Sequence, residues 1–111
     1  MTAQEFRRLA LRLPHTAEGA HMGHPDFRVG GRVFATLGYP SAGWAMVRLP
    51  PEYQEFFVRT QSASFAVVKG AWGRAGATNI KLRLASKAAA AEALGVAWEH
   101  TATRKQAKRG R

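Results

Sequence analysis

Two glycines between two extended segments constrain the fold of this chain most strongly. The segments 26–29 (Asp-Phe-Arg-Val) and 32–37 (Arg-Val-Phe-Ala-Thr-Leu) flank the pair Gly30-Gly31. Glycines accept the positive φ angles of a two-residue hairpin turn, so this stretch predicts two antiparallel strands. With strict alternation, Phe27, Val29, Phe34 and Arg32 share one face, and the other carries Arg28, Val33, Ala35 and Leu37. Both faces are partly apolar, and the pattern leaves open which one is buried.

Other segments predict helices and further strands. Thr2-Ala3-Gln4-Glu5 is a capping-box pattern that starts a helix, and Ser86 can cap an alanine-rich closing helix, which Gly95 kinks or divides. Pro50-Pro51 opens another helix. The remaining expectations are a loop over 15–25, strands over 44–49, 64–69 and 77–84 (with Ile80, Leu82 and Leu84 inward), and a glycine-rich loop over 70–76. The order is helix, three strands, helix, two strands, helix, which predicts an antiparallel sheet with helices in the α+β class.

Positive charge is concentrated at the C-terminus. The 111 residues include 17 Lys and Arg against 7 Asp and Glu, and five of these cations lie in the last eight residues: Arg104, Lys105, Lys108, Arg109 and Arg111. The length fits one domain, so we expect a single compact domain over 1–103 and a disordered basic tail over 104–111. The tail is either a non-specific phosphate-binding arm or a solvated end.

The net charge of +10 favours polyanionic partners, including DNA. The longest stretch without a charged residue, 33–47, has 15 residues, fewer than the about 20 that a membrane-spanning helix needs. We therefore expect a cytoplasmic protein without membrane association, either a monomer or a weak homo-oligomer. The absence of cysteine excludes a disulfide scaffold and a thiolate zinc site.

The segment 15–26 gathers the side chains Glu18, His21, His24 and Asp26, which are of types that bind metals. Their spacing is not that of a helical His-Glu-x-x-His site, so a polar loop without a metal is expected. No serine lies in a nucleophile elbow, and 70–76 lacks the spacing of a phosphate loop. The sequence therefore predicts no catalytic residues and no cofactor. Trp72 is either a lid over the core or part of a binding surface.

Outward-facing cations form the more coherent candidate site. Those of the folded part are Arg28, Arg32, Arg74, Lys81 and Arg83, and a basic hairpin or strand face can lie against a DNA backbone. Nearby tryptophans could stack unpaired bases or belong to the core, namely Trp44, Trp72 and Trp98.

Three segments carry a resemblance to a known family. Residues 13–38, with Glu18-Gly19 and the run from His21 to Gly38, resemble the MmcQ/YjbR family, as do residues 46–49 and 68–82. The resemblance covers residues 3–102 and implies a compact α+β fold with a curved antiparallel sheet packed with helices. It also implies DNA binding, because this fold is similar to a double-wing DNA-binding domain, and it carries over no catalytic residues. The residues that match its motifs are Glu18, His24, Phe27, Arg28, Phe34, Trp72, Gly73, Arg74 and Gly76.

The sequence therefore predicts a DNA-binding protein that is not an enzyme and that contacts mainly phosphates. The docking surface would comprise the cations of the folded part, and Arg104, Lys105, Lys108 and Arg109 of the tail would add non-specific attraction. The alternative is a module that binds a small molecule or a protein. Its pocket would lie between Trp72 and the segment that holds Glu18, His21 and His24.

Overall fold

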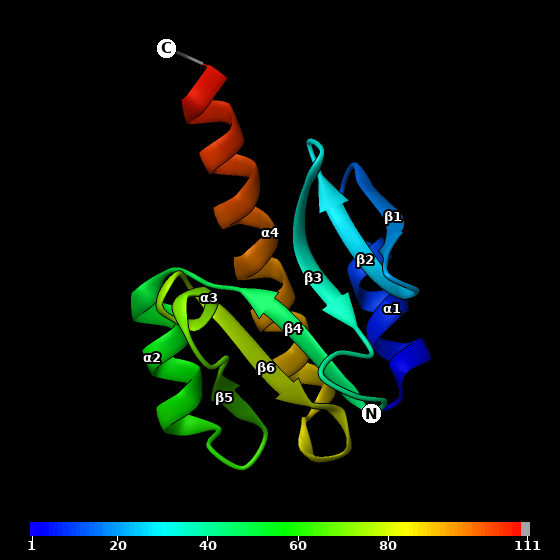
Figure 1. The fold of residues 1–111 in the computed structure, drawn as a ribbon, viewed down its shortest axis with the longest axis vertical. Helices are drawn as coiled ribbons and strands as arrows, with labels where there is room; N and C mark the ends of the chain where they lie inside the picture. The colour runs from blue at the N-terminus through cyan, green and yellow to red at the C-terminus, as the bar shows by residue number, and fades with distance from the viewer. Residues whose placement is uncertain (110–111) are drawn as a thin grey trace.

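The computed structural model describes the backbone of residues 1–109 and the side chains of residues 1–103. The described residues form a six-stranded antiparallel sheet with the order β1-β2-β3-β4-β6-β5 and helices packed against it (Figure 1). The predicted α+β class is confirmed. The elements are α1 (Ala3–Leu11), β1 (Thr16–His21), β2 (His24–Val29), β3 (Arg32–Leu37), β4 (Trp44–Arg48), α2 (Pro51–Thr60), β5 (Phe65–Val67), α3 (Ala71–Arg74), β6 (Ala77–Lys81), the 3-10 turn η1 (Leu82–Leu84) and α4 (Lys87–Arg109).

The hairpin predicted at the glycine pair is present as β2 and β3. Gly30 and Gly31 have φ angles of 60° and 81°, as the turn requires. The register shifts between Phe27, which pairs with Ala35, and Arg28, which pairs with Val33, so Phe34 is an extra residue in a β-bulge.

This bulge breaks the strict alternation expected for these two strands. Ala35 and Leu37 lie in the core together with Phe34, whereas Val33 faces the opposite side of the sheet, where it lines a hollow. The expectation that Val33, Ala35 and Leu37 share a face is therefore wrong. The sequence pattern left open which face of the hairpin is buried. In the structure it is the face that carries Phe27 and Val29.

A second hairpin occupies the segment expected to be a loop. Residues 16–21 form β1 and pair with β2, and Met22 and Gly23 make the turn with φ angles of 52° and 82°. The sequence does not predict this strand because its side chains show no apolar alternation. It is an edge strand whose side chains are small or polar and mostly exposed.

Three further boundaries differ from expectation. The strand predicted over 77–84 ends at Lys81 and continues as η1, so Leu82 is buried but Leu84 is 48% exposed. The predicted loop over 70–76 contains the short helix α3, and the strand predicted over 64–69 is shortened to β5. Gly95 does not divide α4, which is one element.

The core lies between one face of the sheet and the helices α1 and α4 (Figure 1). Alanines on α4 let this helix approach the sheet closely, because a methyl side chain adds little width to the contact. The core side chains include Phe6 and Ala10 of α1, Ala90, Ala93, Leu94 and Ala97 of α4, and Phe27, Phe34, Val47 and Ile80 of the sheet. Among the described elements only α3 lies over the other face, which we call the open face.

Helix α4 runs to Arg109, so the boundary expected after residue 103 does not coincide with the end of a helix. The side chains of the basic tail, including Arg104, Lys105, Lys108 and Arg109, lie outside the described residues. Their phosphate-binding role stays a prediction. None of the described helices is both long and apolar enough to cross a membrane.

The capping box predicted at the N-terminus is present and makes stability depend on pH. Glu5 accepts a hydrogen bond of 2.8 Å from the backbone N–H of Thr2, which lowers the pKa of its carboxylate below 4.5. Because folding lowers this pKa, the charged carboxylate stabilises the fold above about pH 4.5, and this contribution is lost as the pH falls through the folded-state pKa.

The variant Glu5→Gln keeps an acceptor but removes the charge. We expect it to be less stable than the unaltered chain at neutral pH and to equal it in strongly acidic solution, where Glu5 is protonated. Urea unfolding at a series of pH values checks this. A stability difference that is constant across the series contradicts it.

A candidate binding site on the open face of the sheet

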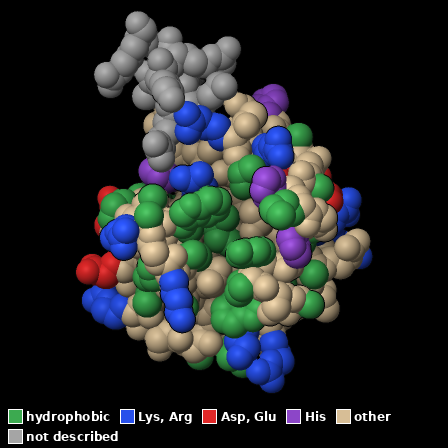
Figure 2. Space-filling model, viewed as in Figure 1, with side chains coloured by type: hydrophobic (Ala, Val, Ile, Leu, Met, Phe, Trp, Pro, Cys, Tyr) green, Lys and Arg blue, Asp and Glu red, His purple; other side chains and the backbone are tan. Residues whose placement is uncertain are grey.

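The floor of the site is a row of side chains that crosses five strands on the open face. Cross-strand pairing links Asp26 to Thr36, Thr36 to Met46, Met46 to Asn79 and Asn79 to Ala66. Directly paired residues project from the same face of a sheet, so these side chains form a continuous surface. In Figure 2 hydrophobic side chains gather at the centre of this face, and Lys, Arg and His side chains surround them.

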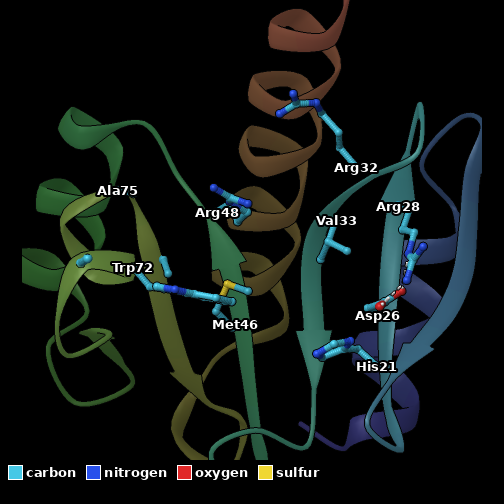
Figure 3. Close-up of a pocket in the computed structure, with 11 residues that line it drawn as sticks. His21, Asp26, Arg28, Arg32, Val33, Met46, Arg48, Trp72 and Ala75 are labelled. Carbon is cyan, nitrogen blue, oxygen red and sulfur yellow. Dashed lines mark hydrogen bonds and ion pairs between the residues drawn. The ribbon is translucent and has the colours of Figure 1, made fainter.

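A first hollow of about 680 Å³ lies over β3 and β4. Trp72 from α3 and His21 from β1 point into it from opposite sides (Figure 3). Trp72 is 73% exposed, which excludes the alternative of a lid over the core. The lining residues are His21, Asp26, Arg28, Arg32, Val33, Met46, Arg48, Ala71, Trp72, Ala75 and Ala77.

An ion pair fixes one side of this hollow. Arg28 donates from Nε to Oδ1 of Asp26 at 2.9 Å and from Nη2 to Oδ2 at 3.0 Å, and Asp26 is buried. These bonds raise the pKa of the Arg28 guanidinium above its ordinary value. A Cβ atom on Gly19 of β1 would lie 2.9 Å from Oδ1 of Asp26, so a glycine is needed beside the pair. Because Arg28 is bound to the carboxylate of Asp26, its positive charge is already compensated.

The charges of Arg32 and Arg48 are the ones available to a ligand. Among the described residues of the lining, Asp26 is the only acid and is paired with Arg28, so no described acid in the lining balances the positive charges of Arg32 and Arg48. Arg32 and Arg48 also line one small cavity beside Thr101 of α4, which places them close together. Both side chains are partly exposed. Arg48 projects from the open face, whereas Arg32 pairs with the core residue Val29 and reaches the hollow from the end of the β2–β3 hairpin, beside α4.

Two glycines hold α3 against the rest of the fold and so place Trp72. A Cβ atom on Gly73 would lie 1.7 Å from the carbonyl oxygen of Val68, and one on Gly76 would lie 2.2 Å from that of Leu49. The side chain of Gln54 in α2 donates to the carbonyl of Gly73 at 3.0 Å. The motif Trp72-Gly73-Arg74-Ala75-Gly76 thus requires glycines for close backbone packing.

A second hollow of about 590 Å³ adjoins the first and shares Met46, Trp72 and Ala77 with it. Trp44 lies in its lining, and Nζ of Lys81 lies 5.7 Å from the centre of the Trp44 ring, a cation–π contact. The complete lining is Thr36, Tyr39, Pro40, Trp44, Met46, Ala66, Val67, Val68, Lys69, Trp72, Ala77 and Asn79.

The structure brings together only part of the predicted basic surface. Arg28 and Arg32 line the first hollow, and Lys81 lies beside the second. Arg74 is exposed on α3 and Arg83 is exposed in η1, both outside the two linings. Sequence reasoning missed Arg48, although alternation along β4 from Met46 would have placed it on the same face.

The predicted pocket residues also separate. His21 and Trp72 line the first hollow, but Glu18 accepts a bond of 2.7 Å from Nε of Arg7 and ties β1 to α1. His24 packs edge to face on Tyr39, with ring centres 5.7 Å apart. Among the described residues, no three His, Asp or Glu side chains are grouped in a way that could hold a metal ion.

The three tryptophans have different environments. Trp98 is partly buried against the core and donates from Nε1 to the carbonyl of Pro14 at 2.9 Å, so its role is structural. Trp44 and Trp72 both face the hollows. Of the three, only these two are placed to meet a ligand on the open face.

Comparison with known proteins places this architecture in a family. The family model YjbR matches residues 11–100. The fold is similar to the crystal structure of Deinococcus radiodurans protein DR2400, whose family-model domain is DUF419. The TM-score is 0.68 at 19% identity, over 84% of this chain and 72% of that one. None of the curated proteins matches the chain. Because the family model covers most of its length, the chain belongs to the YjbR family.

Proposed function

We propose that this protein binds DNA through the open face of its sheet, mainly by phosphate contacts. The observation that carries the proposal is the pair Arg32 and Arg48 at the first hollow, where no acid among the described lining residues balances their positive charges. Arginine side chains bind phosphate oxygens through two parallel hydrogen bonds, and such contacts orient a protein on DNA without selecting a sequence.

The other cations have secondary roles in this proposal. Lys81 adds positive charge beside Trp44, and Arg74 and Arg83 lie exposed on neighbouring elements. Arg28 belongs to the surface, but its bonds to Asp26 make it a fixed part of the wall. The basic tail supplies long-range attraction that does not depend on sequence.

The salt dependence of binding tests the proposal. Affinity for a random-sequence duplex is measured by fluorescence anisotropy at several salt concentrations. The full-length chain is compared with a variant in which Arg104, Lys105, Lys108, Arg109 and Arg111 are all glutamine. Each phosphate contact contributes about −0.9 to the slope of log affinity against log salt. We expect the glutamine variant to bind more weakly with a shallower slope that still corresponds to several contacts. Loss of all binding in this variant would mean that the tail, and not the open face, binds DNA.

A second candidate function is supported by the size of the first hollow. Its volume of about 680 Å³ lies within the range of about 300–1,000 Å³ usual for small-molecule sites. His21 and Trp72 line it together, as the alternative of a ligand-binding module expects. Two results together would favour this candidate: a small molecule that raises the thermal unfolding temperature of the chain, and duplex binding that disappears in the glutamine variant.

A further inference from the structure

Trp72 stands between two hollows, each of which combines aromatic or apolar walls with positive charge. The first hollow has Arg32 and Arg48, and the second has Trp44, Tyr39 and Lys69. Trp72 is 73% exposed and makes little use of its apolar surface in folding. Close backbone packing at Gly73 places α3, and with it the Trp72 backbone, beside both hollows, so an exposed indole is available for stacking there.

We propose that the strand bound on the open face is single-stranded, with two successive unpaired bases lying on either side of the Trp72 indole. This proposal rests on the proposed function and adds the strandedness of the DNA and the position of its bases. The base in the first hollow lies over Met46 and Val33, and the base in the second lies against Trp44. Phosphates next to the two bases contact Arg32 and Arg48 on one side and Lys69 on the other.

The shape of the site selects a single strand over a duplex. In a duplex every base is paired and stacked, so it offers no free ring face to Trp72 and cannot enter a concave surface. A duplex can reach only the cations at the rim. An unpaired strand gains base stacking as well, and stacking tolerates any sequence because every base has a π face. The single strand is therefore expected to bind more tightly than the duplex.

The test uses the full-length chain, a labelled short oligothymidylate and a random-sequence duplex, with affinity measured by fluorescence anisotropy. Trp72→Ala is expected to lower the affinity for the oligothymidylate about ten- to a hundredfold and to leave the affinity for the duplex unchanged. Trp72→Phe keeps an aromatic ring and is expected to restore most of the loss. Tyr53→Ala, which removes an exposed aromatic side chain from α2, is the matched control and should change neither affinity.

The possible outcomes separate this proposal from the proposed function. If the unaltered chain binds duplex and single strand equally and Trp72→Ala weakens neither, or weakens both alike, the stacking proposal is wrong while DNA binding stands. If the unaltered chain binds neither probe at low salt, both are wrong. Competition with thymidine 5′-monophosphate and with a thymidine dinucleotide tests the two-base site, and the dinucleotide is expected to compete much better. Equal competition would mean a site for a free nucleotide and would overturn the proposal.

Discussion

Gly76→Ala is expected to lower the free energy of unfolding by about 2–6 kcal/mol, from strained backbone and overpacking together. The φ angle of Gly76 is 109°, which side chains other than hydrogen rarely allow, and the new Cβ atom would lie 2.2 Å from the carbonyl oxygen of Leu49. The carbonyl of Gly76 also accepts a hydrogen bond of 3.0 Å from the N–H of Leu49, so the two segments cannot separate without losing it. Domains of this size have about 5–15 kcal/mol of stability in total. Urea unfolding followed by circular dichroism measures the change.

The same substitution at Gly95 is the control. Gly95 lies within α4, and a Cβ atom there would meet nothing within 4 Å. In a helix interior alanine is favoured over glycine by about 0.5–1 kcal/mol, so Gly95→Ala should be neutral or stabilising. If Gly76→Ala unfolds at the same urea concentration as Gly95→Ala, the close contact between Gly76 and Leu49 is not what requires glycine.

The double variant Arg32→Glu/Arg48→Glu is expected to bind oligonucleotides at least about a hundredfold more weakly than the unaltered chain. A hydrogen bond to a charged group contributes about 1.5–3 kcal/mol, so the loss of two such contacts accounts for this factor. Both arginines are partly exposed and lie outside the core. The thermal unfolding temperature should therefore change little. The salt slope should also become shallower by about 0.7–0.9 for each lost contact.

A variant of equal net charge shows whether position matters. Arg8 on α1 and Arg59 on α2 are exposed and lie outside both hollows. Arg8→Glu/Arg59→Glu changes the total charge by the same amount and is expected to weaken binding far less. Equal weakening by the two double variants would mean that net charge alone governs the affinity, and the open face would lose its assigned role.

Local signals in the sequence predicted the elements that have them. The glycine pair and its flanking apolar residues indicated β2 and β3, and Thr2 with Glu5 indicated the start of α1. β1 could not be predicted, because its stability comes from pairing with β2 and not from buried side chains of its own. The bulge at Phe34 has no signal in a pattern that assumes strict alternation.

The candidate site was predictable only in fragments. Alternation placed Arg28 and Arg32 on strands, but the hollow that they line also needs Arg48 from β4 and Trp72 from α3. Nothing in the local sequence reveals that these segments meet, because the sheet order brings them together. The exposure of Trp72 was also hidden, since it depends on where α3 lies on the sheet and not on the residues next to it in sequence.

The separation between the buried face and the open face makes this sheet suitable for redesign. Successive residues of β4 and β6 alternate between the faces, so Ala45, Val47 and Ile80 belong to the core while Met46 and Asn79 face the hollows. A library that varies Thr36, Met46 and Asn79 would change the shape of the binding surface and leave the core intact. Asp26 is the position to keep fixed, because it is buried and holds Arg28 in place. New ligand specificities can thus be sought on this scaffold while the residues of the buried face stay unchanged.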